Sequence, residues 1–567
     1  METATLIDVL RVQAAARGDD VLYRFLDDGE RAGSSMTFAS VDRRARQIGA
    51  ALQRRFAPAS RLLLVVPPGP DVIGGFFGAL CGGMVPVPVY PPQERAAVAA
   101  VGKIAADAAV GGVLTSRALL DQMAAAGLPF GGAFDAVVLD DLTGDPDAWS
   151  DPRAGGDDLA FLQYTSGSTG DPKGVMVAHG GLLTTIDDID RAFHHDRDSV
   201  LVSWLPTYHD MGLIYGVLLP LRMGFSCYLM PPAAFLRRPI RWLRAMSAYG
   251  GTHSASPNFG YDLCVRKTTP EERASLDLSR WRVASNGAEP IREATMLDFA
   301  EAFAGAGFRF DAFTPSYGLA EATLKVATAR AESPPVVIGV DARALEERRV
   351  VDDGSGQVRR LVGCGHSDIG AEIRIVDPAT AELCPPGTVG EIWVKSRSVA
   401  KGYWRRPEQT RQTFQATTAD GRGPFLRTGD LGFVADGELF VTGRVKDLIV
   451  LRGRNYYPHD VEYAAESSSP ALRRGCATAF TVDDGAEQSV VLLLEAQPEH
   501  AAGNELRDVI REARNAATRD TGVALDAIVV FPAGTLPKTS SGKVRRGASR
   551  ELYLAGRGGA IAEWHRA

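Results

Sequence analysis

The sequence predicts an α/β protein of several subdomains with largely parallel sheets. Short apolar stretches, typical of buried strands, alternate with helical stretches through the N-terminal part of the chain. The chain has 567 residues. That length exceeds a single hydrophobic core and leaves room for roughly three to four units of ordinary domain size.

The elements expected before residue 140 follow one another at short intervals. Helices are expected at 6–16, 38–56, 72–80 and 103–109, and strands at 62–66, 85–90, 112–115 and 136–139. The stretch 72–90 has no charge over 19 residues and could be mistaken for a membrane span. Its glycines and prolines favour a buried helix that stops at Gly82 and Gly83, followed by a core strand. No transmembrane segment is therefore expected.

Composition narrows the class of partner. The formal net charge is −7 and the pI is near 5.8. No nucleic acid partner is expected, because binding to a phosphate backbone requires a basic face. The six cysteines include no CxxC pair, so the sequence indicates neither a disulfide framework nor a zinc site. Together with the lack of a signal pattern near the N-terminus, this predicts a cytoplasmic location.

The segment 164–174 (YTSGSTGDPKG) has the composition of a phosphate-binding loop. Glycines let the backbone approach a ligand closely, hydroxyls add donors, and the lysine adds a mobile charge. A buried strand expected at 159–163 would lead into the loop. A surface turn is the alternative, but it needs neither four hydroxyls nor a Pro-Lys-Gly ending, and no Walker spacing is present. The candidate phosphate ligands are Thr165, Ser166, Gly167, Ser168, Thr169, Gly170 and Lys173.

This loop resembles the phosphate-binding signature of the adenylate-forming superfamily, which includes acyl-CoA synthetases, luciferases and the adenylation domains of peptide synthetases. Further motifs of that superfamily follow in order: YHDMGL, GAEP, YGLAEAT, RTGD, GRVKD and PKTSSGK. The resemblance implies ATP and Mg²⁺ as cofactors. It also implies a large N-terminal domain (1–443) of two α/β subdomains plus a small β-rich subdomain, a hinge (444–447), and a small mobile α+β C-terminal domain (448–567).

Three of these motifs supply candidate ligands for the acyl group, the adenine and the metal. His209 lies at an expected strand end, where side chains reach a cleft. A lone histidine is more often structural, but the resemblance places it at the mouth of the acyl pocket. Glu321 can ligate Mg²⁺ through carboxylate oxygen, and the resemblance gives it that role together with Thr165. The candidate adenine-binding residues are Gly287, Ala288, Glu289, Tyr317 and Gly318.

The remaining motifs lie in the last third of the chain. Asp430 can accept two hydrogen bonds from the vicinal hydroxyls of a ribose, and it matches the family's ribose ligand. A hairpin is expected at 431–442 around an Asp-Gly type I′ turn. The resemblance then places Arg444 at the nucleotide and Lys446 at the pivot of the hinge. It identifies Lys543 as the catalytic lysine, although a basic loop near a C-terminus is usually only solvated.

Within the superfamily, the sequence most resembles the fatty acyl-AMP ligases. This resemblance rests on the sequence stretches WLPTYHDMGLI, SPNF, NGAEP and KDLIVLRGRNYYPHDVE. A long polar segment between Lys325 and Leu361 also supports it. It implies that a medium- or long-chain fatty acid is activated as acyl-adenylate with release of pyrophosphate. The acyl group would then pass to the phosphopantetheine thiol of an acyl carrier protein of polyketide, nonribosomal peptide or lipid biosynthesis. No Asp-Ser-Leu attachment site follows Arg546, so the carrier is expected to be a separate protein.

Two alternatives stay open on the sequence. A fatty acyl-CoA synthetase would share the fold and the first step but use CoA as acceptor. A non-catalytic adenylate-binding scaffold would carry damaged motifs, whereas Lys543, Glu321 and Asp430 are all present. Release of a CoA thioester would favour the first alternative.

Overall fold

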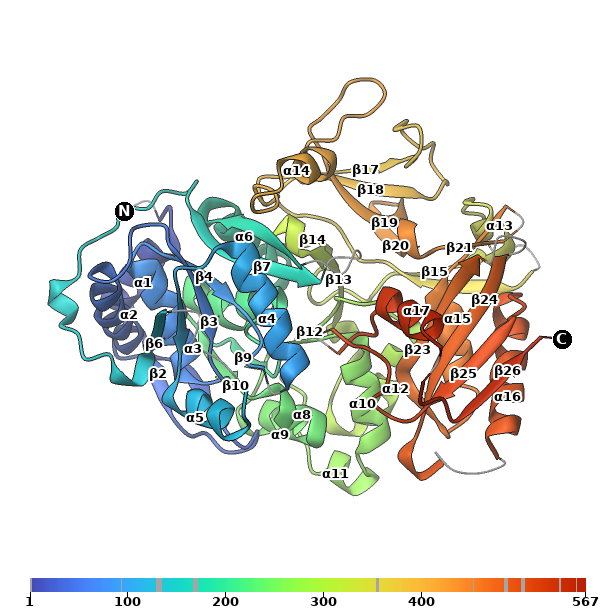
Figure 1. Ribbon diagram of the computed structural model, residues 1–567, viewed down its shortest axis with the longest axis horizontal. Helices are drawn as coiled ribbons and strands as arrows, with labels where there is room; N and C mark the ends of the chain where they lie inside the picture. The colour runs from blue at the N-terminus through green and yellow to red at the C-terminus, as the bar shows by residue number, and fades with distance from the viewer. Residues whose placement is uncertain are drawn as a thin grey trace.

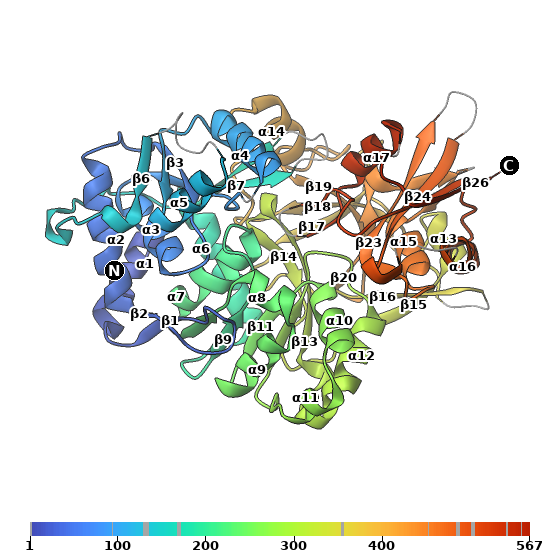
Figure 2. The ribbon, with the colours of Figure 1, turned by 60° about the horizontal axis from the view of Figure 1, so that its bottom comes forward.

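The computed structural model describes residues 3–92, 94–128, 135–166, 172–352, 356–451, 453–483, 488–500, 505–539, 542–556 and 558–566. They form two α/β units, a β-rich unit and a C-terminal unit (Figures 1 and 2). The predicted α/β architecture is confirmed.

The first α/β unit is built on a four-stranded parallel sheet of order β4-β3-β5-β6. Its strands are β3 (Arg61–Val65), β4 (Val85–Pro88), β5 (Gly112–Thr115) and β6 (Asp135–Val138), and its helices are α2 (Phe38–Gln53), α3 (Pro70–Cys81), α4 (Arg95–Ala108) and α5 (Arg117–Ala125). α2 and α3 can approach closely because Gly78 has no side chain. A Cβ at that position would lie only 2.4 Å from Ile48. The uncharged stretch 72–90 thus forms a core helix and strand, and no helix of the described residues is long and apolar enough to cross a membrane.

The second α/β unit contains an eight-stranded sheet of order β14-β13-β12-β11-β9-β10-β1-β2, parallel except at its two edges. Its strands are β1 (Val21–Phe25), β2 (Ser35–Thr37), β9 (Val200–Ser203), β10 (Ser226–Leu229), β11 (His253–Ser256), β12 (Val283–Asn286), β13 (Phe313–Leu319) and β14 (Leu324–Thr328). The helices are α1 (Leu6–Arg17), α6 (His179–Phe193), the π-helix η3 (Met211–Leu218), α7 (Leu219–Met223), α8 (Pro232–Arg237), α9 (Ile240–Ala248), α10 (Asn258–Lys267), α11 (Pro270–Ala274) and α12 (Glu293–Phe303). One hydrophobic cluster runs through both α/β units.

The phosphate-binding segment differs from the expected strand-to-loop exit. The strand β7 (Leu159–Ser166) continues into the predicted loop, and the chain returns as the antiparallel strand β8 (Pro172–Ala178). The apolar residues of β8 explain the return, because Val175 and Val177 are buried against the core. The segment therefore connects two strands of a hairpin, and its residues 167–171 lie outside the described part of the chain.

The β-rich unit is a four-stranded sheet of β17 (Glu372–Val376), β18 (Gly390–Lys395), β19 (Leu426–Ala435) and β20 (Glu438–Arg444), with helix α14 (Pro407–Phe414) beside it. The predicted hairpin is confirmed: β19 and β20 meet at Asp436 and Gly437, whose φ values of 50° and 83° are those of a type I′ turn.

The polar segment before Leu361 is not a plain loop. It contains the antiparallel strands β15 (Val337–Asp341) and β16 (Val358–Val362) with helix α13 (Ala342–Glu346) between them. Leu345 is fully buried in a cluster with Tyr457 of the C-terminal unit. A few buried apolar positions are therefore enough to fix the structure of this otherwise polar segment.

The C-terminal unit has a four-stranded sheet, a two-stranded sheet and helices. Its elements are β21 (Ile449–Leu451), β22 (Arg454–Tyr456), α15 (Pro458–Glu466), β23 (Leu472–Asp483), β24 (Gln488–Ala496), α16 (Glu505–Thr521), β25 (Ala527–Phe531), α17 (Arg546–Leu554) and β26 (Ala562–His565). Among the described residues, its own core draws only on positions from Ile449 onward. The 3₁₀ turn Val445–Asp447 stands just before that core, at the predicted hinge.

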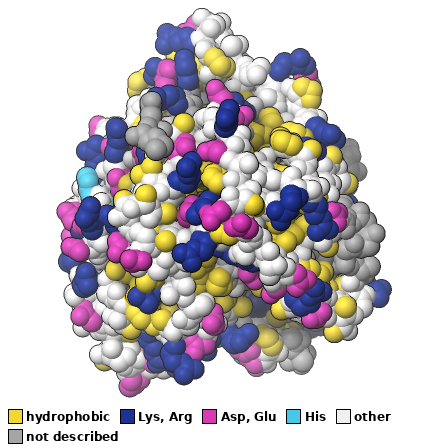
Figure 3. All heavy atoms as spheres, turned by 90° about the vertical axis from the view of Figure 1, so that its left-hand side faces the viewer, with side chains coloured by type: hydrophobic (Ala, Val, Ile, Leu, Met, Phe, Trp, Pro, Cys, Tyr) yellow, Lys and Arg dark blue, Asp and Glu magenta, His cyan; other side chains and the backbone are white. Residues whose placement is uncertain are grey.

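Charge is mixed on the face formed by the left-hand side of Figure 1. Figure 3 shows Lys and Arg side chains interspersed with Asp and Glu side chains over this face.

Candidate active site

The predicted catalytic lysine reaches from the C-terminal unit to the second α/β unit. Lys543 Nζ donates a hydrogen bond to the carbonyl oxygen of Ala288. Burial lowers the pKa of the lysine, while the carboxylates of Glu289 and Asp210 oppose that shift. The lysine is therefore not on a free, solvated loop, because its loop closes over the turn predicted to bind adenine.

That turn has a backbone only glycine can supply at its first position. A Cβ on Gly287 would lie 2.7 Å from the carbonyl oxygen of Ser316 on β13. Ala288 follows with φ 66°, in the left-handed region. Glu289 turns back to the protein, where its Oε1 accepts a hydrogen bond of 2.6 Å from the backbone N–H of Phe259. The glutamate thus shapes the turn as well as facing Lys543.

The candidate adenine and ribose ligands meet through one carboxylate. Tyr317 on β13 donates from its hydroxyl to Asp430 Oδ2 at 2.7 Å, and Arg444 Nε donates to Asp430 Oδ1 at 2.7 Å. Asp430 and Arg444 are cross-strand partners on β19 and β20. Asp430 is only 5% exposed, so its orientation is fixed before any ligand arrives.

Glu321 and Lys173 lie on either side of Tyr403. The hydroxyl of Tyr403 donates to Glu321 Oε1 at 2.7 Å, and Lys173 Nζ lies 5.1 Å from the centre of the Tyr403 ring. Burial lowers the pKa of Lys173, the charge of Lys446 lowers it further, and Glu321 raises it. Lys446 at the predicted hinge and Glu321, the candidate metal ligand, therefore both act electrostatically on Lys173.

Two candidate phosphate ligands can be placed. Thr165 on β7 is the cross-strand partner of Lys173 on β8. The predicted ligands Gly167, Ser168, Thr169 and Gly170, and the side chain of Ser166, lie outside what the structure describes.

Gly318, a candidate adenine-binding residue, packs its backbone against Leu324. A Cβ on Gly318 would lie 1.7 Å from the Leu324 carbonyl oxygen.

His209 lies just before the N-terminus of the buried π-helix η3. Its Nδ1 lies 2.7 Å from Asp210 Oδ1, and Asp210 also accepts the N–H of Met211 at 2.7 Å. The loop is joined to β7 because Gln163 Nε2 donates to the carbonyl oxygen of Tyr208 at 3.1 Å. His209 is thereby oriented by a carboxylate. Burial raises the pKa of Asp210, but His209 and the hydrogen bond from Met211, with a smaller effect of Lys543, lower it overall.

Two residues of this site were not singled out from the sequence. Tyr403 orients Glu321, and Asp210 contacts His209. Asp210 lies inside the motif YHDMGL, and Tyr403 lies in the stretch VAKGYW. Only their three-dimensional contacts show a role, since a buried tyrosine in a β-rich segment ordinarily indicates packing.

Comparison with known proteins identifies the family of the chain. The model of the family described as "AMP-binding enzyme" matches residues 10–404. The chain belongs to this family. A medium-chain-fatty-acid–[acyl-carrier-protein] ligase, JamA, of Moorena producens is 41% identical, with 98% of this chain and 96% of the relative covered. A 4-hydroxyphenylalkanoate adenylyltransferase of Mycobacterium marinum is 37% identical, with 98% and 92% covered.

Solved structures match nearly the whole length of this AMP-binding enzyme. A fatty acid AMP ligase from Legionella pneumophila is 37% identical with a TM-score of 0.77, covering 99% of this chain and 98% of that one. A structure from work on fatty acyl-adenylate ligases from E. coli and L. pneumophila is 30% identical with a TM-score of 0.87, covering 98% and 99%. The prediction that this chain is an adenylate-forming ligase of the fatty acyl-AMP ligase group is confirmed.

Proposed function

We propose that this ligase activates a medium- or long-chain fatty acid with ATP and transfers the acyl group to the phosphopantetheine thiol of a separate acyl carrier protein. One observation carries the proposal: Lys543 of the C-terminal unit donates a hydrogen bond to the Ala288 turn. The carboxylates of Glu289, Asp210 and Asp430 also act electrostatically on its ammonium group. That is the pose in which a lysine can reach a nucleotide held by the turn and by Asp430.

The first step brings together two anions, the fatty carboxylate and the α-phosphate of ATP. Repulsion between unit charges about 4 Å apart is roughly 4 kcal/mol at an effective dielectric of about 20. Lys543 supplies positive charge between them, and Lys173 supplies it at the phosphate hairpin. No side chain acts as nucleophile, so positioning and charge compensation provide the acceleration.

The site also fits Mg²⁺. Glu321 Oε1 is oriented by Tyr403, and the carboxylate acts electrostatically on Lys173 at the phosphate hairpin. Thr165 adds a hydroxyl oxygen on the facing strand. A single carboxylate with a hydroxyl suits Mg²⁺, which keeps several waters and phosphate oxygens and needs no full protein cage. When bound, the ion would neutralise charge on the pyrophosphate that leaves.

The second step requires a thiol to enter where Lys543 stands. We infer that the C-terminal unit rotates about Lys446 and exchanges the face it presents to the site. The separate core of the C-terminal unit supports this, as does the 3₁₀ turn Val445–Asp447 in front of it. The limits 1–443, 444–447 and 448–567 remain predictions.

Contacts of the segment 337–362 with the C-terminal unit support carrier protein over CoA as acceptor. Arg359 Nη1 lies 2.8 Å from Asp460 Oδ2, and Gln357 Nε2 donates to the carbonyl oxygen of Asp520 at 2.6 Å. Asn455 Nδ2 donates to the carbonyl oxygen of Glu346 at 2.9 Å. These contacts stabilise the present pose, and a carrier protein can offset that bias with interface contacts that free CoA lacks.

One assay tests the proposal. The purified protein is incubated with ATP, Mg²⁺, a fatty-acid panel and either CoA or a holo carrier protein. We expect pyrophosphate release with fatty acids and acyl transfer to the carrier. Efficient CoA thioester synthesis would replace this proposal by the fatty acyl-CoA synthetase alternative, and no pyrophosphate release would favour the scaffold. The cytoplasmic location and the lack of a nucleic acid partner stay predictions from composition.

A further inference from the structure

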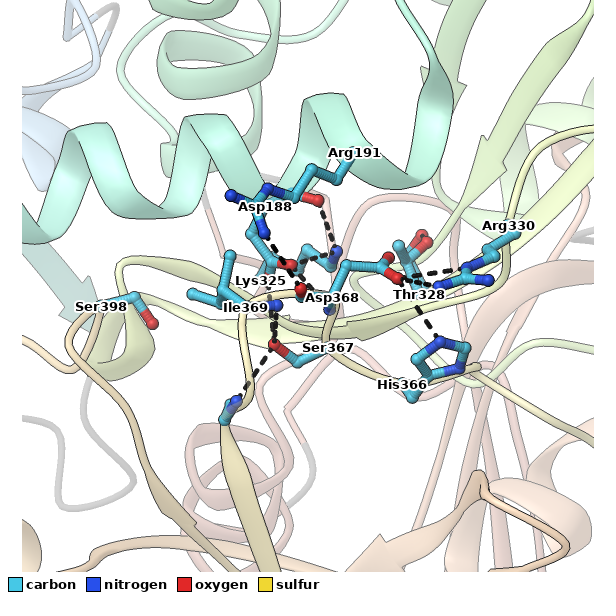
Figure 4. A network of polar contacts seen from close by, with 12 residues as sticks. Asp188, Arg191, Lys325, Thr328, Arg330, His366, Ser367, Asp368, Ile369 and Ser398 are labelled. Atoms are coloured by element: carbon cyan, nitrogen blue, oxygen red, sulfur yellow. Dashed lines mark hydrogen bonds and ion pairs between the residues drawn. The ribbon is translucent and has the colours of Figure 1, made fainter.

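A buried ion network anchors the hairpin that carries Glu321 (Figure 4). Lys325 Nζ on β14 lies 3.1 Å from Asp188 Oδ1 on α6, with side-chain exposures of 4% and 3%. The same ammonium donates to the carbonyl oxygen of Asp188 at 2.8 Å. Asp188 also accepts the N–H of Asp368 at 2.9 Å and the hydroxyl of Ser367 at 3.2 Å. The network thus joins β14 to α6 and to the chain that follows β16.

The hairpin tip next to this anchor is strained. β13 and β14 pair Gly318 with Lys325 and Leu319 with Leu324, so Glu321 lies in the short tip between the strands. Thr323 and Leu324 in that tip have φ values of 59° and 105°. Such values are uncommon for residues other than glycine, and they persist only where the surroundings impose them.

The surroundings that impose this conformation can be named. Gly318 has no side chain, which lets the carbonyl oxygen of Leu324 close over it. Lys325 is the next residue, and its buried ammonium fixes the strand to α6. On the other side, the N–H of Ala400 donates to the carbonyl oxygen of Glu321 at 2.9 Å. The backbone path of Glu321 is therefore held from both ends of the tip.

We propose that Lys325 is a positioning residue for the carboxylate of Glu321, acting through the strained turn at Thr323 and Leu324. The inference rests on the proposed metal role of Glu321. A buried ion pair of this kind can often be replaced by apolar or neutral groups without loss of stability. Its value here is the fixed register of the hairpin tip.

The test measures metal binding separately from catalysis. Binding of Mn²⁺ to the enzyme with α,β-methylene-ATP is followed by electron paramagnetic resonance, and the Mg²⁺ dependence of pyrophosphate release is measured in parallel. The variants are Lys325→Met and the double variant Lys325→Met/Asp188→Asn, which leaves no unpaired buried charge. We expect Mn²⁺ affinity to fall about tenfold in both, as for other residues that orient metal ligands. Saturating Mg²⁺ should restore kcat to within about twofold of the parent, because chemistry at Lys543 is intact.

A matched control comes from the same network. Arg330 Nε donates to Asp368 Oδ1 at 3.1 Å, but Arg330 is 55% exposed and follows the far end of β14. Arg330→Met should leave metal affinity unchanged. Parent-like Mn²⁺ affinity in the double variant would overturn the inference, and so would an equal loss in Arg330→Met.

A reference variant separates this inference from the function on which it rests. Glu321→Gln should itself weaken Mn²⁺ binding. A loss in Glu321→Gln without a loss in the Lys325 variants would reject only the positioning role. Normal metal binding by Glu321→Gln would reject the metal role of Glu321 and the inference with it.

Discussion

At the scale of single residues, the site is held ready by short hydrogen bonds between distant positions. Asp430 receives one bond from Tyr317 and one from Arg444, and both measure 2.7 Å. The two donors leave lone pairs on each oxygen for a ribose, since an ionised carboxylate has about four acceptor sites. The carboxylate thus needs little reorganisation to bind a nucleotide.

Removal of Asp430 should weaken the use of ATP. In Asp430→Ala, a charge-assisted contact is lost, and such contacts are typically worth about 1.5–3 kcal/mol. We expect a higher KM for ATP, measured by pyrophosphate release. Tyr317→Phe, which keeps the carboxylate and removes one orienting donor, should change KM in the same direction but less. Unchanged KM and kcat in Asp430→Ala would contradict the ribose assignment.

Removal of Lys543 should block adenylation while leaving the fold intact. Within the described part of the chain, its ammonium hydrogen-bonds only to a turn carbonyl, and the residue is half-buried. Loss of one preorganised charge at a developing anion usually costs about 10²–10³ in kcat or more. Lys543→Ala should therefore lose pyrophosphate release by at least that factor. Lys538 lies in the same loop, and its Nζ contacts Cys476 Sγ at 3.0 Å, so Lys538→Ala serves as the control. Near-normal release by Lys543→Ala would disprove the role.

At the scale of elements, helix α15 ends on a buried carboxyl group. Glu466 is 9% exposed, and its Oε2 accepts the N–H of Gly475 at 2.8 Å. Burial raises the pKa of Glu466 to about 7. Since the pKa is raised in the folded state, the stability that this group contributes is present below its unfolded value near 4.5 and is lost as pH rises to about 7.

The variant Glu466→Gln should remove this pH dependence. A glutamine oxygen can still accept the N–H of Gly475, and no charge is buried. We expect the free energy of unfolding to rise by at most about 3 kcal/mol at pH 8, from about 1.4 kcal/mol per pKa unit, and to change little at pH 4. Chemical denaturation at both pH values measures this. A gain of equal size at pH 4 would show that ionisation is not the cause.

The sequence predicted elements well where their signal is local. The strand expected at 112–115 is β5 without change, and the turn at Asp436 and Gly437 has the predicted geometry. The helix expected at 103–109 begins earlier, at Arg95, because the alanine-rich stretch before it has high helix propensity. The hairpin β7–β8 was missed because its pairing depends on a strand that follows the loop.

At the scale of the whole molecule, what escaped prediction is contact between distant segments. Tyr317 and Asp430 are 113 positions apart, and Lys543 and Ala288 are 255 apart. Motifs identified the side chains, yet the first contact depends on how the β-rich unit lies against the second α/β unit, and the second depends on how the C-terminal unit lies. That placement rests on contacts such as Arg292, whose guanidinium lies 3.8 Å from the centre of the Tyr463 ring.

The segment 337–362 should bias the choice of acceptor through those same interfaces. Arg359 pairs with Asp460, and its guanidinium lies 4.4 Å from the centre of the Tyr457 ring. Arg359→Ala removes these two contacts with the C-terminal unit and a third, of 3.1 Å, between Arg359 Nη2 and His459 Nε2. It leaves the paired backbone of β15 and β16. A loss of about 1.4 kcal/mol in this pose changes its population ratio tenfold. We therefore expect acyl-CoA formation to rise relative to acyl-carrier formation.

The control for this change lies in the same segment. Arg349 is 59% exposed and its guanidinium pairs only with the neighbouring Glu347 among the described contacts, so Arg349→Ala should leave the acceptor ratio unchanged. Replacing residues 342–357 by a short turn is the stronger version, because Asp341 and Val358 are already cross-strand partners. Both acceptors are compared with the same fatty acid, and pyrophosphate release reports whether the first step is intact. Efficient CoA thioester synthesis by the unaltered enzyme would contradict this role of the segment 337–362. The segment would then impose no barrier that free CoA cannot overcome.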